Sequence, residues 1–207
     1  MEKIKKFAVN VDRVAKVAAI IYFIAGVCAG IACFVVIIAA LFDRDVFLQL
    51  DEYSRISLGY VKLQPQLEYA AAYRTSGDAS IIRLIVSTLS LAVLCFLFYF
   101  MAKVVRKIVQ PMKEAQPFEE SVHKNLKKLG VFILLQGVVW ELAKMYTEFI
   151  QYHEYQIASL FDSQKIASCT LDFRFDLTFL VAALVVFGLS YIFQYGTELQ
   201  KFSDETV

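Results

Sequence analysis

The sequence predicts an all-α integral membrane protein, a bundle of four transmembrane helices in a single membrane domain covering residues 1–207. Three observations predict this fold class. Of the 207 residues 58% are hydrophobic, four long apolar segments are spaced along the chain, and basic residues concentrate in alternate connections. A soluble domain averages about 45–50% apolar residues, and a lipid environment accounts for the excess.

The four apolar segments have the length that a membrane crossing needs, about 20 residues. We expect spans at about 17–42, 81–102, 129–150 and 177–197. The run from Val17 to Phe42 is too long for the apolar region of a signal peptide, about 7–15 residues, and is interpreted as a retained helix. The third span contains an uncharged stretch only from Leu129 to Trp140. Its assignment rests on the charge pattern of the chain and on a charged stripe.

The basic residues predict the orientation, because cytoplasmic segments carry an excess of Lys and Arg. Residues 1–16 contain five and the connection 103–128 contains seven, against four in 43–80 and two in 151–176. Both termini and the middle loop are therefore expected in the cytoplasm, and the loops 43–80 and 151–176 on the outside.

The first outer loop is expected to have structure of its own. Asp43–Tyr53 has apolar residues at helical spacing, and Gln66–Tyr73 follows Pro65 and is rich in Ala, so two short helices are predicted. The alternation of apolar and small residues over 56–60 allows a short strand between them.

A stripe of charged residues in the third span is the strongest local signal. Glu141, Lys144 and Glu148 fall close together around a helix that turns by 100° per residue. Ionisable groups near the bilayer centre cost about 2.5–3.5 kcal/mol each on insertion scales, so they are expected to face the bundle. The stripe is either a self-neutralised set that fixes helix packing or the lining of a polar cavity, and the first interpretation is favoured.

Small residues and cysteines in the apolar segments are interpreted mainly as packing residues. Gly26 and Gly30 form a GxxxG pattern that permits close helix approach, inside the bundle or, less favoured, in a homo-oligomer. Cys169 is the one cysteine outside the apolar segments, so no disulfide framework is expected within the chain. A bridge from Cys169 to another chain is the weaker alternative.

Motifs for catalysis and cofactor binding are missing from the sequence. It contains no phosphate-binding GxxxxGK[ST] loop, no GxSxG elbow and no HExxH zinc motif. The two histidines, His123 and His153, are predicted on opposite sides of the membrane, so they cannot share a haem or metal. We expect no enzyme, no cofactor and no metal. A net charge of +1 also gives no reason to expect direct nucleic-acid binding.

Two polar segments at the cytoplasmic side carry a resemblance to a known family. The middle loop matches the pattern Pro-Phe, then Leu with two basic residues and a Gly, at Pro117, Phe118, Leu126, Lys127, Lys128 and Gly130. The tail matches a second pattern at Tyr195, Gly196, Leu199, Gln200, Thr206 and Val207. In both, the chain resembles the uncharacterised bacterial membrane proteins of domain-of-unknown-function family 2975. It departs from them at Asn125, where a basic residue is usual, and at Ser121-Val122, where the usual Asn-Val pair is displaced.

The resemblance implies a location in the bacterial cytoplasmic (inner) membrane and a possible cytoplasmic partner. Members are often encoded beside a small helix-turn-helix regulator, a DNA-binding protein. The leading hypothesis is therefore a non-enzymatic membrane protein that senses a signal or binds such a regulator through 103–130 and 196–207. The alternative is a small transporter or tolerance protein that uses the charged stripe of the third span.

Overall fold

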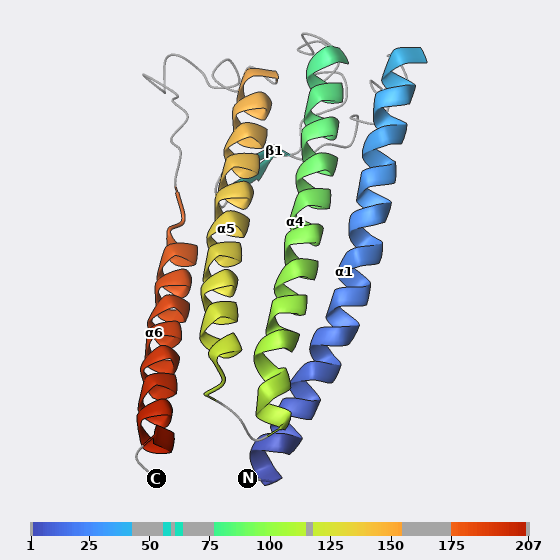
Figure 1. Cartoon of the computed structure of the whole chain (residues 1–207). Coiled ribbons are helices and arrows are strands. Elements are labelled where there is room, and N and C mark those ends of the chain that lie inside the picture. The colour runs from blue at the N-terminus through green and yellow to red at the C-terminus, as the bar shows by residue number, and fades with distance from the viewer. Residues whose placement is uncertain are drawn as a thin grey trace. The chain divides into compact units, whose positions relative to one another are not determined.

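The structure is a computed structural model that describes residues 2–42, 56–58, 61–63, 77–114, 118–154 and 175–205. Its helices are α1 (Glu2–Phe42), α4 (Gly77–Lys113), α5 (Glu120–Glu154) and α6 (Thr178–Glu205) (Figure 1). These four helices are each long and apolar enough to cross a membrane. The predicted four-span helical architecture is confirmed.

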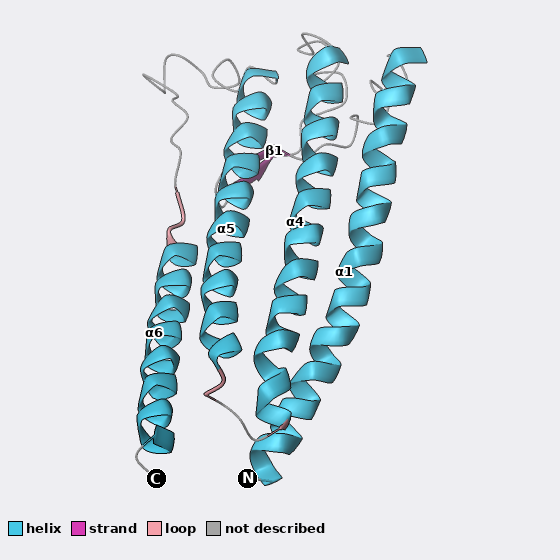
Figure 2. Ribbon diagram, in the orientation of Figure 1, coloured by secondary structure: helices cyan, strands magenta, loops and turns pink. Residues whose placement is uncertain are grey.

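Two short strands lie in the region predicted as the first outer loop. β1 (Ile56–Leu58) pairs antiparallel with β2 (Val61–Leu63), with Ile56 opposite Leu63 and Leu58 opposite Val61 (Figure 2). The strand expected within 56–60 is therefore present. The helices predicted at Asp43–Tyr53 and Gln66–Tyr73 lie outside the described residues, as does most of the second outer loop.

The chain divides into two compact units. The first unit contains both termini and comprises Met1–Cys28, Ala92–Trp140 and Asp176–Val207. The second unit comprises Ala29–Leu91 and Glu141–Phe175. In the first unit, α1 begins, α4 ends, α5 begins and α6 ends at one end, which we call the terminal end (Figure 1).

Glycine and phenylalanine side by side bring α5 and α6 together in the first unit. A Cβ added at Gly130 would lie 2.6 Å from the ring of Phe187, and one added at Gly196 would lie 2.6 Å from the ring of Phe118. The ring of Phe179 similarly covers Gly137. Helices in lipid associate through such close packing because no water is released between them. We call these three pairs the glycine–phenylalanine seam.

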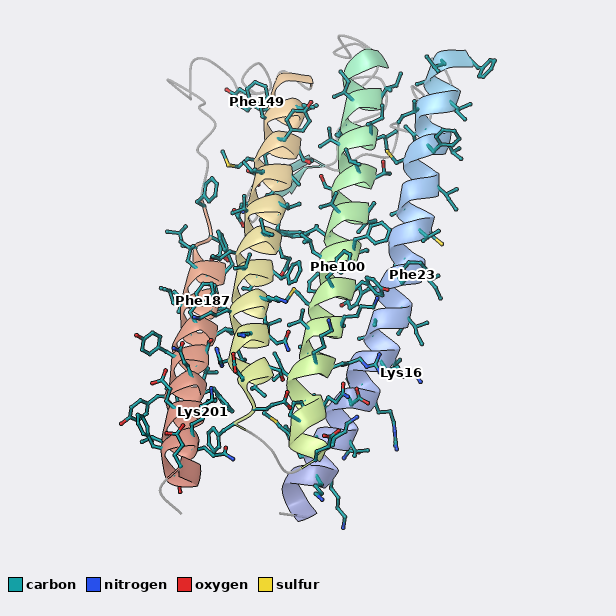
Figure 3. The ribbon with its side chains drawn as sticks, in the orientation of Figure 1. Lys16, Phe23, Phe100, Phe149, Phe187 and Lys201 are labelled. Carbon is teal, nitrogen blue, oxygen red and sulfur yellow. The ribbon has the colours of Figure 1, made fainter. Side chains whose placement is uncertain are left out.

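A buried apolar cluster lies near the terminal end of the first unit. It consists of Val104 and Ile108 of α4 with Val122 and Leu126 of α5. Val186 and Phe193 of α6 pack against it, and Phe100 of α4 stacks on Phe132 of α5 with ring centroids 6.1 Å apart (Figure 3). All four cluster residues fall in the segment 103–128, which was predicted as a connection. Most of this segment is instead helical, in the end of α4 and the start of α5.

The helices extend beyond the predicted spans for a physical reason. The apolar runs mark only the part of each helix in contact with lipid, and α1 begins 15 residues before the predicted span at 17. Beyond the runs, apolar residues recur at helical spacing among charged ones, as in Val104, Ile108 and Met112. The connection between α4 and α5 shortens to 114–119. There the Glu114 N–H donates a hydrogen bond to the Pro111 carbonyl over 3.0 Å.

Helix α1 packs on α4 through a row of small side chains. Ala8, Ala15, Ala19 and Gly26 are buried and recur at intervals of seven, four and seven residues. A Cβ added at Gly26 would lie 3.3 Å from the Cβ of Cys95 on α4. The packing interpretation of the GxxxG pattern is thus supported for Gly26. Gly30 has no described atom within 4 Å of an added Cβ.

Most apolar side chains of the helices face outward. Fewer than a third of the residues in the most apolar window of each helix are buried, and exposed residues such as Val181 and Leu184 recur along α6. Such surfaces fit a lipid bilayer.

The second unit buries two ionisable side chains among its apolar helices. Arg83 of α4 is 8% exposed and Glu141 of α5 is 3% exposed. In the same unit the thiol of Cys33 on α1 lies 3.9 Å from the Ile85 carbonyl oxygen on α4. Cys28, Cys33 and Cys95 are free thiols, and Cys169 lies outside the described residues.

The seam predicts that two glycine substitutions will differ in their effect on stability. Gly130→Ala should destabilise the protein by roughly 1–3 kcal/mol, the usual cost of overpacking, because the ring of Phe187 occupies the space of the new methyl group. Gly188→Ala on α6 is the matched control, since an added Cβ there meets no described atom within 4 Å. Thermal unfolding in detergent measures both. Equal melting temperatures for the two variants would contradict the seam.

Candidate functional site

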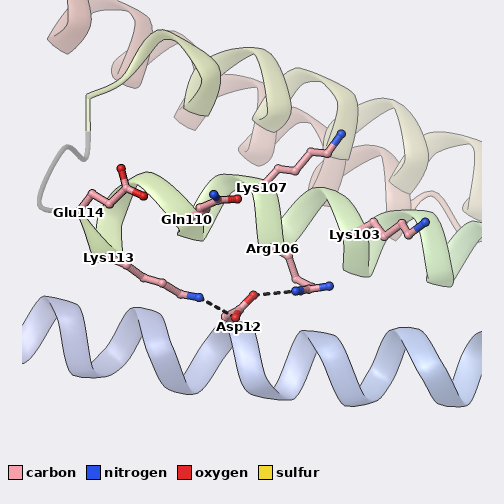
Figure 4. Close-up of a pocket in the computed structure, with 7 residues that line it drawn as sticks. All are labelled: Asp12, Lys103, Arg106, Lys107, Gln110, Lys113 and Glu114. Atoms are coloured by element: carbon pink, nitrogen blue, oxygen red, sulfur yellow. Dashed lines mark hydrogen bonds and ion pairs between the residues drawn. The ribbon is translucent and has the colours of Figure 1, made fainter.

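Four cationic side chains share one face of α4 just beyond its apolar run. Lys103, Arg106, Lys107 and Lys113 recur at intervals of three, one and six residues, and the run itself ends at Ala102. Together with Gln110 of α4, Glu114 directly after α4 and Asp12 of α1, they line an open cleft of about 610 Å³ (Figure 4). All seven residues belong to the first unit. We call this feature the basic cleft.

Asp12 holds two of the four cations. Its Oδ1 accepts a hydrogen bond from Arg106 Nε over 3.0 Å, and its Oδ2 accepts one from Lys113 Nζ over 2.6 Å (Figure 4). Asp12 precedes the apolar run of α1 by five residues and lies on the same face as the buried Ala8 and Ala15. The hydrogen bonds from Lys113 and then Arg106 hold the pKa of the Asp12 carboxyl below its ordinary value.

The other two cations do not point toward Asp12 (Figure 4). The Lys103 ammonium lies 4.5 Å from the centre of the Tyr99 ring, a cation–π arrangement. Lys107 also lines a smaller hollow of about 260 Å³ toward α5, together with Pro111, Glu119, Ser121 and Asn125. Gln110 and Glu114 line both hollows, so the basic cleft continues toward the start of α5.

The two polar segments predicted to bind a partner, in the middle loop and the tail, lie against each other. The ring of Phe118 covers Gly196, and the centroids of the Phe118 and Phe193 rings are 5.8 Å apart. Thr197 Oγ1 donates a hydrogen bond to the Phe118 carbonyl over 2.8 Å. Lys201 Nζ lies 3.7 Å from a carboxylate oxygen of Glu120. Residues separated by about 80 positions in sequence therefore form one surface at the terminal end.

The structure divides the predicted partner-binding residues into two groups. Phe118, Leu126, Gly130 and Gly196 make contacts between the start of α5 and α6, with Leu126 buried in the apolar cluster and Phe118 still 41% exposed. The other group consists of exposed residues, namely Lys127, Lys128, Tyr195, Leu199 and Gln200. Pro117, Thr206 and Val207 lie outside the described residues. Partner binding by the exposed group stays a prediction.

The predicted charged stripe does not lie on one buried face. Glu141 is buried, Lys144 is exposed and Glu148 is partly buried. On α4 of the same unit, the Thr88 hydroxyl shares its proton between the carbonyls of Leu84 and Ile85, whose oxygens lie 2.8 and 3.1 Å from its Oγ1, as expected for a hydroxyl satisfied by its own helix. Of the three residues of the stripe, Glu141 is the one that is buried, and it stays a candidate for the functional role predicted for the stripe.

Asp12 and Arg83 were not identified from the sequence as site residues. The signal for Asp12 was present, because it falls between Ala8 and Ala15 on a row of small residues at helical spacing. Its two partners are 94 and 101 positions away in sequence, so the ion pairs could not be predicted. Arg83 lies inside the span expected at 81–102, and its burial in α4 depends on tertiary packing that the sequence does not show.

Within the part of the chain that the structure describes, no group of three or more His, Cys, Asp or Glu side chains is arranged to hold a metal ion. His123 instead contributes its backbone carbonyl to helix packing. The buried Ser190 hydroxyl of α6 donates a hydrogen bond to that carbonyl over 2.8 Å.

Comparison of the chain with family models, with curated proteins and with solved structures finds no match.

The ion pairs of Asp12 predict a pH-dependent contribution to stability. A carboxyl whose pKa is lowered in the folded state stabilises the protein above its ordinary pKa, and the contribution is lost as the pH falls through the lowered value. Asp12→Asn should therefore lower the melting temperature at pH 7, and the difference from wild type should shrink below about pH 4.

Glu114→Gln is the matched control, because it removes an exposed carboxyl from the same cleft. Thermal unfolding in detergent across this pH range measures both variants. A destabilisation by Asp12→Asn that is the same at all pH values would contradict the assigned ion pairs.

Proposed function

We propose that this is a non-enzymatic, multi-pass membrane protein that binds a regulatory protein at its terminal end. One observation carries the proposal: the 118–130 and 193–202 segments pack together and present a composite surface from α5 and α6. A surface assembled from two helices is a stable platform for recognition, since the helix contacts and not the partner hold its residues in place.

The exposed residues of this surface have the mixed chemistry of a protein interface. Tyr195 and Leu199 are 62% and 52% exposed, and Lys127, Lys128 and Gln200 add charge and hydrogen-bonding capacity. Interfaces combine exposed aromatic and apolar anchors with a polar rim. Phe202, one turn beyond Leu199, is 67% exposed and extends the apolar part of the surface.

The terminal end faces the cytoplasm in this proposal. The basic residues of α1 and α4 collect there, and cytoplasmic segments are the ones enriched in Lys and Arg. The membrane would be the bacterial inner membrane, as the resemblance of the two segments implies. Any partner of the terminal end is then a cytoplasmic protein.

The partner we propose is a small helix-turn-helix regulator. The resemblance in the two segments motivates this choice, and the cytoplasmic position of the composite surface is compatible with it. The protein itself would not contact nucleic acid. Holding a regulator at the membrane would keep it from DNA, and a signal that alters the α5–α6 contact would release it.

The second candidate function is a small transporter or tolerance protein, and the burial of Glu141 favours it. A carboxyl that is 3% exposed in a membrane-spanning helix is costly to insert and marks a functional position in many transporters. Arg83, also buried, belongs to the same unit. The exposure of Lys144 removes one member of the predicted stripe from this role.

Photo-crosslinking from α6 tests the partner. A photo-reactive amino acid in place of Leu199 should crosslink in cells to a soluble protein with a DNA-binding domain. The same amino acid at Leu184 should crosslink to lipid, because Leu184 is an exposed leucine within the apolar run of the same helix. Leu199→Ala should lower recovery of the partner about tenfold, equivalent to roughly 1.4 kcal/mol of lost contact energy.

Equal recovery of the same proteins from positions 199 and 184 would contradict the proposed surface. Crosslinks at position 199 to lipid alone would do the same.

Replacement of the buried carboxyl tests the second candidate. Glu141→Gln keeps the size of the side chain and removes its charge, so it should abolish a transport or tolerance phenotype while α5 still folds. Glu148→Gln is the control and should leave the phenotype intact, because Glu148 lies seven residues further along α5 and is partly exposed. Survival of the phenotype in Glu141→Gln cells with normal protein levels would exclude the transporter function.

A further inference from the structure

The basic cleft lies at the level of the membrane surface. Its α4 side begins at Lys103, the residue directly after the apolar run, and extends to Lys113 and Glu114. Its α1 side is formed by Asp12, which at 1.5 Å per residue lies about 7.5 Å before the apolar run that starts at Val17. This is the depth at which the phosphate groups of phospholipids meet a membrane protein.

We propose that the basic cleft binds the phosphate of an anionic phospholipid. The cleft contains four cationic side chains and two carboxylates, so its net charge is +2. Its volume is about 610 Å³. This volume falls in the range of about 300–1,000 Å³ that ligand sites occupy. Basic pockets beside membrane helices are the usual binding sites of anionic headgroups.

Several donors of the cleft remain available for an oxygen ligand. Arg106 uses its Nε–H on Asp12, and a guanidinium has four further N–H donors. The ammonium groups of Lys103 and Lys107 do not point toward Asp12 (Figure 4), and both side chains are exposed. Lys103, Lys107 and the N–H groups of Arg106 that Asp12 does not use are therefore available to a phosphate in the cleft while Lys113 stays with Asp12.

The membrane side of the cleft favours a lipid over a soluble phosphate. Lys103 lies over the ring of Tyr99, and that ring contacts Phe23 and Phe100 with centroid distances of 5.3 Å in each case. Phe23 and Phe100 are 46% and 45% exposed. The basic donors match a lipid phosphate, and the aromatic side chains next to them match the acyl chains of the same lipid. Soluble phosphate would use only the donors.

Asp12 acts as an internal competitor of the phosphate. Its carboxylate holds Arg106 and Lys113 in the same cleft, so it occupies cationic groups that an anion would otherwise bind. Removal of its charge raises the net charge of the cleft from +2 to +3 and frees both cations. A purely structural role of the ion pairs predicts no such gain in anion binding.

Native mass spectrometry of the protein in neutral detergent tests the site. We expect phosphatidylglycerol to bind as a single retained lipid and phosphatidylcholine to bind at least tenfold more weakly. Lys103→Gln/Lys107→Gln should raise the Kd for phosphatidylglycerol about tenfold. Lys127→Gln/Lys128→Gln should leave it unchanged, because it removes the same charge from exposed positions on α5 outside the cleft.

Two further arms keep the source of the phosphate and the role of Asp12 testable. Asp12→Asn should lower the Kd for phosphatidylglycerol several-fold, and inorganic phosphate at the same concentrations should not displace the lipid. Equal loss of lipid in the two double-lysine variants would overturn the site. Weaker binding in Asp12→Asn would overturn the role assigned to Asp12, and full displacement by inorganic phosphate would overturn the lipid as ligand. None of these results depends on the protein partner proposed above.

Discussion

The close approach of α5 and α6 through glycine is the contact on which the rest of the first unit depends. In lipid, apolar side chains gain little by meeting one another, so helices need surfaces that fit closely. Gly130 and Gly137 leave space that a phenylalanine of α6 fills, and Gly196 leaves space for Phe118, which directly precedes α5. The last of these contacts places Phe118 and Thr197 at hydrogen-bonding distance, and with them the two segments that form the composite surface. A larger residue at any of the three positions would separate the surface into its parts.

Different forces act along the length of the same helices. Within the apolar runs, burial is slight and packing depends on small residues such as Ala19 and Gly26. Beyond the runs, Val104, Ile108, Val122 and Leu126 form a cluster of the kind that holds soluble helical proteins together. The ion pairs of Asp12 and the basic cleft lie between these two parts, where the apolar runs end. The charged groups there are close to water and to lipid phosphate, and their placement is far less costly than at the bilayer centre.

The four spans could be predicted from the sequence, because apolar runs of this length form membrane-spanning helices in a chain of this composition. The sequence was insufficient for the helix ends and for the site. The segment 103–128 was expected as a connection, since its lysines conceal the apolar repeat of Val104, Ile108 and Met112. The charged stripe of α5 followed from angular spacing alone, which cannot show that Lys144 is exposed while Glu141 is buried. Asp12 was overlooked because its meaning depends on Arg106 and Lys113, whose proximity arises from tertiary packing. Phe118, Gly130 and Gly196 were predicted as partner-binding residues. The structure shows that they also make contacts between the start of α5 and α6, and their role in partner binding stays a prediction.

The most direct test of this account is an engineered disulfide across the terminal end of the seam. A Cβ added at Gly196 lies 3.5 Å from Phe118 Cγ. The sulfur of a cysteine at position 118 takes the place of this Cγ, so it lies close enough for a disulfide with a cysteine at position 196. In membranes of a variant without its native cysteines, Phe118→Cys/Gly196→Cys should oxidise rapidly within one chain, whereas Phe118→Cys/Leu184→Cys should not. Failure of the first pair to crosslink, or equal crosslinking of both pairs, would contradict the assembly of α5 and α6 into one surface.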